Sequence, residues 1–71
     1  MPNVIGEIQK NETEKITVSL NEYKGFKYVD IRLYFQDKEG SWHPTKKGIT
    51  VSPGKVNTLI GLLSKAKANE A

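Results

Sequence analysis

Residues 21–35, NEYKGFKYVDIRLYF, decide the fold of this chain because they combine a turn with a strand pattern. Val29, Ile31 and Leu33 alternate with polar residues, which is typical of a strand that buries one face. All three Tyr and both Phe of the chain also fall in this stretch, together with three basic residues. A strand that only fills a core does not need so many rings and positive charges, so the stretch also raises a question of function.

A second strand pattern precedes this stretch. Residues 15–23, KITVSLNEY, place Ile16, Val18 and Leu20 on one face and polar residues on the other, as in a half-buried strand rich in β-branched residues. Gly25 then marks a hairpin turn. The two patterns therefore predict an antiparallel pair of strands.

The segment after Phe35 predicts a turn and two more strand pieces. A polar run ends at Gly40 and is typical of a turn. Residues 41–44, SWHP, predict a short strand that Pro44 stops, and residues 45–52, TKKGITVS, predict a last strand with its apolar residues facing inward.

The chain then changes from a strand period to a helical one. Ser52 followed by Pro53 indicates a helix start, with a hydroxyl N-cap and Pro at the first helical position. An apolar stripe at helical spacing runs from Val56 to Leu63. Gly61 weakens this helix by about 1 kcal/mol relative to Ala. The C-terminal tail, residues 65–71, is predicted to fray.

Together these patterns predict an α+β fold, in which a four-stranded antiparallel meander is followed by one C-terminal helix (ββββα). The helix is expected to cover one face of the sheet, while Lys, Arg and Tyr side chains occupy the other. We expect a single domain, residues 1–71, with residues 1–14 as an N-terminal extension and residues 15–66 as the binding domain. Residues 4–8 of the extension are compatible with a short strand.

The composition limits both the architecture and the chemistry. A chain of 71 residues buries a limited core, and oligomerisation is a common route to stability at this size, so a homodimer is expected. The absence of Cys and the single His argue against disulfides, a metal site or a cofactor. No apolar run approaches the roughly 20 residues of a membrane span, and the N-terminus lacks a signal-peptide pattern, so we expect an intracellular protein.

The charge balance and the reactive residues favour a binding protein over an enzyme. Lys and Arg number 11 against 8 Asp and Glu, a formal net charge of +3, which permits an anionic partner without requiring one. His43 has no Cys to pair with, and Ser52 is explained as a helix cap. The sequence has no glycine-rich loop of a nucleotide-binding type. We therefore expect no catalytic residues and no enzymatic activity.

Aromatic and basic residues interleaved on one sheet suit single-stranded nucleic acid, which exposes base faces and a charged backbone. Each stacked base contributes about 1–3 kcal/mol, whereas duplex DNA hides its base faces. Two other interpretations stay open. The rings could be cross-strand pairs that stabilise a small sheet, with the lysines serving solubility, or the open sheet could bind an acidic partner peptide as a protein-interaction module.

Three features near the last turn limit the nucleic-acid hypothesis. Strict alternation places Phe35 with the core residues, so it stacks on a base only if the strand bends or bulges before it. Lys46 and Lys47 are adjacent and point to opposite sides of an extended chain, so both reach one groove only if the backbone turns there. Trp42 is expected in the core or at a dimer contact.

Four motifs, in order and with matching spacing, resemble the DNA-binding domain of a transcriptional coactivator family, positive cofactor four (transcriptional coactivator p15), in its small prokaryotic and phage form. The motifs are the aromatic-Lys-Gly turn of residues 23–25, the Asp-Ile-Arg strand of residues 30–32 with Tyr34 and Phe35, the Asp-x-Glu-Gly turn of residues 37–40, and the segment HPTKKGI of residues 43–49. The resemblance covers about residues 15–63, most of the chain.

The resemblance implies a homodimer of strongly curved sheets that binds single-stranded DNA with little sequence specificity. It implies that bases stack on Tyr23 and Phe35. The expected contacts to phosphates are Lys24, Lys27, Arg32, His43, Lys46 and Lys47. The dimer interface is expected to use apolar residues of the helix, namely Leu59, Ile60, Leu62, Leu63 and Ala66.

The same resemblance implies which partners the protein has and where in the cell it acts. Melted duplex and RNA are alternative ligands, and transcription machinery is a candidate protein partner. Transcription regulation, repair and recombination are the expected processes, in the cytoplasm or nucleoid of a prokaryote or in the nucleus of a eukaryote.

Several positions depart from the family pattern. Phe35 replaces a Trp, His43 and Phe26 each replace a Lys, Asn21 replaces an Arg, and Thr45 replaces the Gly of the last turn. Fewer fixed cations predict weaker, salt-sensitive binding.

Overall fold

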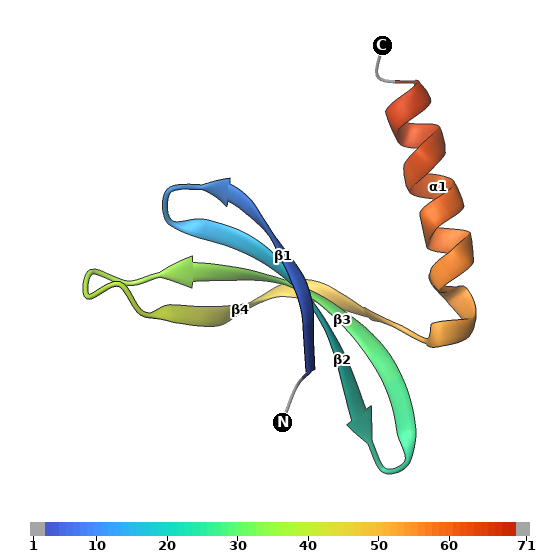
Figure 1. The fold of residues 1–71 in the computed structure, drawn as a ribbon, viewed down its shortest axis with the longest axis horizontal. Coiled ribbons are helices and arrows are strands. Elements are labelled where there is room, and N and C mark those ends of the chain that lie inside the picture. Colours follow the sequence, from blue (N-terminus) through green and yellow to red (C-terminus); the bar gives the residue numbers. More distant parts are fainter. Residues whose placement is uncertain (1–2, 70–71) are drawn as a thin grey trace.

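The computed structural model describes residues 3–69, which form one antiparallel sheet followed by a helix (Figure 1). The elements in chain order are β1 (Asn3–Asn11), β2 (Glu14–Tyr23), β3 (Phe26–Gln36), β4 (Trp42–Val51), the short 3-10 helix η1 (Pro53–Lys55) and α1 (Val56–Ala68). The strands lie in the order β1-β2-β3-β4, so each pairs with its neighbour in sequence. The predicted four-stranded meander with a C-terminal helix is therefore confirmed.

Strand pairing in the middle of the sheet gives it two chemically different faces. Cross-strand pairs such as Ile16 with Leu33 and Val18 with Ile31 lie on one side, which we call the apolar face. The alternate pairs, such as Thr17 with Arg32, lie on the other side, the polar face. The alternation seen in the sequence is the direct cause, because successive side chains of a strand point to opposite faces.

The N-terminal extension forms more structure than the short strand that the sequence suggested. β1 is 9 residues long and pairs with β2 from Asn3 opposite Leu20 to Asn11 opposite Glu14. Its pairing is interrupted twice, between Val4 and Gly6 and between Gln9 and Asn11. Such irregularities bend a strand and increase its twist; together with the one between β3 and β4, they accompany the strong curvature seen in Figure 1.

The prediction that Pro44 stops a short strand is wrong. β4 is one continuous strand of 10 residues that runs through Pro44, and Pro44 lies opposite Tyr34. Proline is tolerated on edge strands and at bulges, where a missing N–H leaves no gap in the ladder. Both conditions hold here, because β4 is an edge strand and its pairing shifts directly after Pro44.

Gly48 ends this shifted segment and allows β4 to return close to β3. A Cβ at this position would lie 2.7 Å from the Ile31 carbonyl oxygen and 3.0 Å from the Arg32 Cα. Real side chains do not fit at such distances, so the close approach of the two backbones requires glycine.

The helix begins as the sequence indicates but does not cover the sheet. Pro53 opens the helical turn directly after Ser52, although the Ser52 side chain makes no cap hydrogen bond. The helix continues to Ala68, further than the predicted fraying allowed. In Figure 1, α1 stands apart from the sheet, and it does not pack along any of the strands.

The chain alone has no closed apolar core. Among residues 3–69, no apolar side chain is fully buried, and the buried polar residues are Thr17 and Ser19 on the polar face. The aliphatic residues of β2 and β3 are only half-buried, while Ile60, Leu62 and Leu63 of α1 are more than half exposed, at 53%, 58% and 59%. The expectation that one helix closes the apolar face of its own sheet is therefore wrong.

Candidate nucleic-acid interface

A two-residue turn joins β2 to β3 and positions the first group of candidate residues. Lys24 and Gly25 form this turn with φ angles of 52° and 82°, as a type I′ hairpin turn requires. A left-handed conformation is easy for glycine but costs a residue such as Lys on the order of 1–2 kcal/mol. Lys24 therefore occupies a turn position at which Asn, Asp or Gly is conformationally preferred.

Exposed rings and cations surround this turn, which we call the hairpin tip. Tyr23 lies directly opposite Phe26, and these two rings are 65% and 77% exposed. The Lys24 ammonium lies 5.3 Å from the centre of the Tyr23 ring. A pocket of about 420 Å³ is lined by Tyr23, Lys24, Phe26, Lys27, Tyr28 and Thr50. The tip thus combines flat apolar surfaces with two positive charges.

Phe35 and His43 form a second group at the other end of β3. Their rings are paired across the strands with centres 5.3 Å apart and planes tilted by 34°. Phe35 is 42% exposed. β3 keeps its regular pairing with β2 up to Phe35, so the ring stays on the apolar side, as alternation predicted. Among residues 3–69 no element packs over the ring, so it is open to solvent without the bend that alternation led us to require for stacking.

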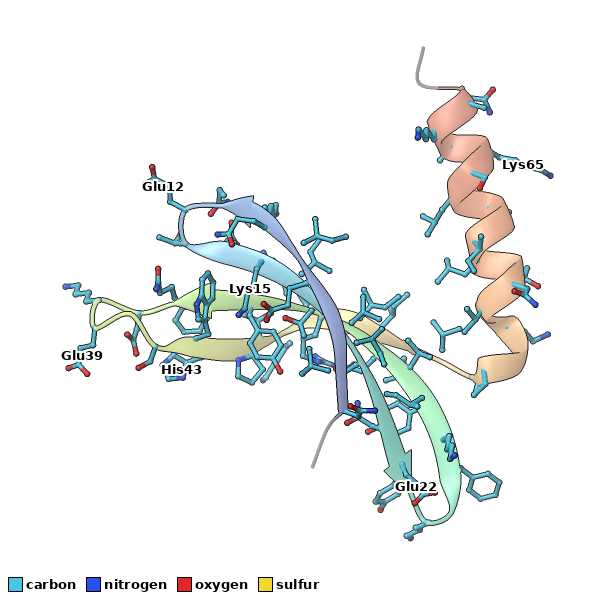
Figure 2. The ribbon with its side chains drawn as sticks, in the orientation of Figure 1. Glu12, Lys15, Glu22, Glu39, His43 and Lys65 are labelled. Carbon is cyan, nitrogen blue, oxygen red and sulfur yellow. The ribbon has the colours of Figure 1, made fainter. Side chains whose placement is uncertain are left out.

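Asp37 anchors His43 and the turn between β3 and β4. Its Oδ1 accepts hydrogen bonds from the backbone N–H groups of Glu39 and Ser41 at 2.8 and 3.0 Å, and its Oδ2 lies 2.6 Å from His43 Nε2. The hydrogen bond with His43 is the largest influence, followed by the Ser41 N–H, and together they lower the pKa of Asp37 below its ordinary value of 3.8. Figure 2 shows His43 and Glu39 near one end of the sheet and Glu22 at the opposite end.

The backbone around Lys46 and Lys47 is irregular. Such an irregularity is the condition under which both side chains can reach the same groove. Between the pairs Arg32–Gly48 and Tyr34–Pro44, the chain of β4 has extra residues relative to β3. The Thr45 hydroxyl stabilises this bulge by donating to the Leu33 carbonyl at 2.7 Å and accepting from the Lys47 N–H at 3.1 Å. Thr45 thus has a structural role.

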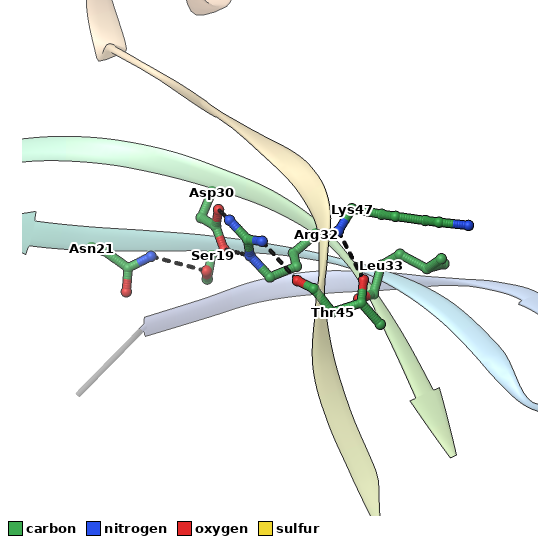
Figure 3. A network of polar contacts seen from close by, with 7 residues as sticks. All are labelled: Ser19, Asn21, Asp30, Arg32, Leu33, Thr45 and Lys47. Atoms are coloured by element: carbon green, nitrogen blue, oxygen red, sulfur yellow. Dashed lines mark hydrogen bonds and ion pairs between the residues drawn. The ribbon is translucent and has the colours of Figure 1, made fainter. Parts of the chain in front are cut away.

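Arg32 is held in a polar network on the polar face (Figure 3). Its Nε and Nη2 donate to the two Asp30 carboxylate oxygens at 3.1 and 3.0 Å, and its Nη1 donates to the Thr45 carbonyl at 2.8 Å. The hydrogen bond and charge of Asp30 raise the pKa of the guanidinium. Three of the five N–H donors of the side chain are therefore engaged within the protein and hold β4 against β3.

Trp42 lies on the polar face under a lysine that the sequence did not single out. Lys15 Nζ lies 4.4 Å from the centre of the Trp42 ring and 2.6 Å from the Glu7 carboxylate. Trp42 is half-buried, and a cation over its ring stabilises this position. Within residues 3–69, Trp42 therefore packs against Lys15 from β2.

The predicted site residues do not form one cluster: two groups lie at the two ends of β3, and Arg32, Lys46 and Lys47 lie between them at the β4 bulge. Tyr23, Lys24 and Lys27 meet at the hairpin tip, while Phe35 and His43 meet about nine residues along β3, roughly 30 Å away at 3.3 Å per residue. Sequence reasoning missed the other residues that line the tip pocket: Phe26, Tyr28 and Thr50. The two-residue turn is the signal that could have found Phe26, since it places residue 26 opposite residue 23.

Comparison with known proteins identifies the family. The model of the family described as Transcriptional Coactivator p15 (PC4) matches residues 10–62. The chain belongs to this family. A PC4 homologue from Burkholderia pseudomallei, in its tetragonal crystal form, has a TM-score of 0.89 and 34% identity, over 94% of this chain and 98% of that one. Its orthorhombic form gives a TM-score of 0.89 and 35% identity, over 93% and 89% of the two chains.

A phage protein shares the fold at a greater distance. The bacteriophage T5 homologue of the eukaryotic coactivator PC4, which is described as implicated in recombination-dependent DNA replication, has a TM-score of 0.75 and 21% identity over 97% of this chain and 80% of that one. The resemblance to a small prokaryotic or phage member of the PC4 family is thereby confirmed. The fold of a curved four-stranded sheet followed by a helix is confirmed with it.

Neither a metal site nor a membrane-spanning helix is found in the part of the chain that the structure describes. Among residues 3–69, no three His, Asp or Glu side chains gather as a metal site would require. No helix in the same range is long and apolar enough to cross a membrane.

Proposed function

We propose that this protein is a homodimer that binds single-stranded DNA with little sequence specificity and acts in transcription regulation, repair or recombination. The observation that supports this most is the hairpin tip, where exposed rings and two lysines surround one pocket. Proteins that bind single strands need rings for bases and cations for phosphates. The PC4 membership and the replication role described for the phage relative point in the same direction.

The proposed contacts follow the two groups of residues. Bases stack on Tyr23 at the hairpin tip and on Phe35 at the opposite end of β3. Phosphates are contacted by the exposed basic residues: Lys24, Lys27, His43, Lys46 and Lys47. Arg32 adds its remaining N–H donors, and its main contribution is to hold the β4 bulge, so its substitution affects the fold as well as binding.

The open shape of the chain supports the proposed dimer. Its radius of gyration is 13.9 Å, whereas a compact domain of this length has about 11 Å. Its accessible surface is 5955 Å², against about 4,500 Å² for a folded monomer of this mass. The excess exceeds the roughly 800 Å² that each partner buries in a standard interface. We place Leu59, Ile60, Leu62, Leu63 and Ala66 of α1 in that interface.

A hollow on the apolar face offers room for the partner's helix. This pocket of about 380 Å³ is lined by Lys10, Ile16, Ile31, Leu33, Lys47, Gly48 and Ile49. An apolar helix side chain from a second copy would fill it and be removed from water. Because the dimer would also bring two sheets together, it would supply two hairpin tips to one DNA strand.

The first test compares the binding of a labelled single-stranded 20-mer and the matching duplex by fluorescence anisotropy at low and moderate salt. We expect preference for the single strand, with a slope of log affinity against log salt near −0.7 per phosphate contacted. An RNA of the same sequence tests the choice of nucleic acid. Equal binding of both DNA forms, or tighter binding of an acidic peptide of similar charge, would contradict the proposal and favour a protein-interaction module.

Two substitutions test the stacking residues separately. Tyr23→Ala and Phe35→Ala should each weaken single-strand binding by about 1–3 kcal/mol, because each removes one base platform. Circular dichroism and gel filtration should show the same fold and association state as the original protein. Loss of the fold in both variants would assign these rings to structure instead.

A further inference from the structure

The side chain of Phe26 is so exposed that its contribution to folding stability does not explain the presence of a Phe at this position. It is the most exposed of the large apolar side chains within residues 3–69, at 77%. Burying a Phe side chain contributes to folding, and a side chain left in water forgoes most of that contribution. The ring also lies beside Lys24 and Lys27 in the lining of the hairpin-tip pocket, within the proposed binding site.

The backbone places Phe26 as the partner of Tyr23. The two residues are the last cross-strand pair before the Lys24–Gly25 turn, so their side chains leave the same face of the hairpin. In the part of the chain that the structure describes, the rings in contact are those of Phe35 and His43. Tyr23 and Phe26 are therefore not stacked on each other, and both line the pocket of about 420 Å³.

The chemistry of this pocket matches a nucleobase whose phosphates lie outside it. Apart from Lys24, Lys27 and Thr50, its lining is aromatic. Bases offer a flat π-face to any ring, whatever their sequence. The two lysines line the same pocket and offer positive charge to the phosphates on either side of such a base, and the hydroxyls of Thr50, Tyr23 and Tyr28 can hydrogen-bond a base edge.

We infer that the hairpin tip is a two-ring site for one unstacked nucleobase, in which Phe26 is a second stacking residue beside Tyr23. This inference rests on the proposed single-strand binding and deepens it. Binding at this tip therefore depends less on salt, and more on stacking, than a lysine at residue 26 would make it.

The test uses the full chain with Phe26→Leu and Phe26→Lys, and anisotropy of a single-stranded 20-mer at several salt concentrations. Phe26→Leu keeps an apolar side chain without a π-face and should weaken binding about 5- to 150-fold. Phe26→Lys should also weaken binding at high salt, while its salt slope steepens by about 0.7 for one added phosphate contact. Ile5→Leu serves as the matched control, since Ile5 of β1 is an exposed apolar residue that lines neither pocket and lies outside the proposed interface.

The possible results distinguish a failure of the two-ring site from a failure of the proposed single-strand binding. If the original protein does not prefer single strands, the proposed function and the inference both fail. If it does, but Phe26→Leu binds equally well, or Phe26→Lys binds more tightly at every salt concentration, the inference alone fails. A change to monomer in both variants, seen by gel filtration, would assign Phe26 to the dimer contact and overturn the inference. Cross-linking of 5-iodouracil DNA to Phe26, located by mass spectrometry, would support it directly.

Discussion

Lys24 combines a costly backbone conformation with a place in the proposed binding site. Its φ of 52° lies in the left-handed region, which Asn and Gly adopt more easily than Lys. Strained backbone positions often coincide with functional sites. The family resemblance and the exposed position of Lys24 at the hairpin tip explain why a cation would be kept there.

The substitution Lys24→Asn should therefore separate stability from binding. We expect the free energy of unfolding to rise by about 0.5–1 kcal/mol, because Asn relieves the strain of the turn. Single-strand affinity should fall, with the salt slope reduced by about 0.7. Denaturant melts and anisotropy measure the two effects. Lys38→Asn, in the exposed β3–β4 turn, has the same charge change and controls for net charge; an equal loss of affinity there would contradict a specific role for Lys24.

At the scale of elements, the close approach of β4 to β3 depends on Gly48. Gly48→Ala would place a Cβ 2.7 Å from the Ile31 carbonyl oxygen, so the strands must separate. We expect a loss of about 1–3 kcal/mol in unfolding free energy, measured by urea melts. Gly54→Ala is the control, since nothing lies within 4 Å of its added Cβ. Equal stability of the two variants would show that the strands adjust without cost.

The turn between β3 and β4 should give stability a dependence on acid pH. The pKa of Asp37 lies below its ordinary 3.8 in the folded chain, so the folded state binds this proton less readily than the unfolded one. The resulting stability is present above the ordinary pKa and is lost as pH falls through the folded pKa. Urea midpoints measured from neutral to acid pH should fall less steeply in Asp37→Asn than in the original protein. Parallel curves would contradict this role.

The elements that sequence reasoning predicted correctly are those with a local cause. Alternating residues 15–23 and 26–36 specify strands because each side chain faces either the apolar or the polar side, and Pro53 fixes the helix start. Pro44 misled the prediction, since its acceptance depends on β4 lying at an edge, which no local pattern reveals. The missed ring of Phe26 has the same origin, because cross-strand pairing depends on the turn type rather than on composition.

At the scale of the whole molecule, the main departure from the sequence prediction is that α1 does not cover the sheet of its own chain. Residues 56–63 show an ordinary amphipathic stripe, and such a stripe normally packs on the sheet of its own chain. The sequence specifies how much apolar surface must be buried but not which copy of the chain buries it. The candidate site has the same limit, since its two groups of residues lie at opposite ends of β3 and a shared site for them would require the proposed second subunit.

A charge placed on this helix should test the proposed dimer. Leu63 is 59% exposed in the single chain, so in a monomer Leu63→Asp would change stability by no more than about 0.5 kcal/mol. In the proposed interface it would bury a carboxylate, and we expect monomers by light scattering and a loss of several kcal/mol. Ser64→Asp adds the same charge one residue later and should leave the dimer intact. A dimer that tolerates both changes would place the interface elsewhere.

The unburied apolar face also determines how this protein would respond to dilution. If apolar side chains leave water only when two copies meet, folding and association are one bimolecular reaction, and the unfolding temperature rises with protein concentration. The number of copies in a cell would then govern the fraction that is folded at all. Synthesis and degradation would regulate DNA binding more than in proportion to abundance, without any ligand or modification.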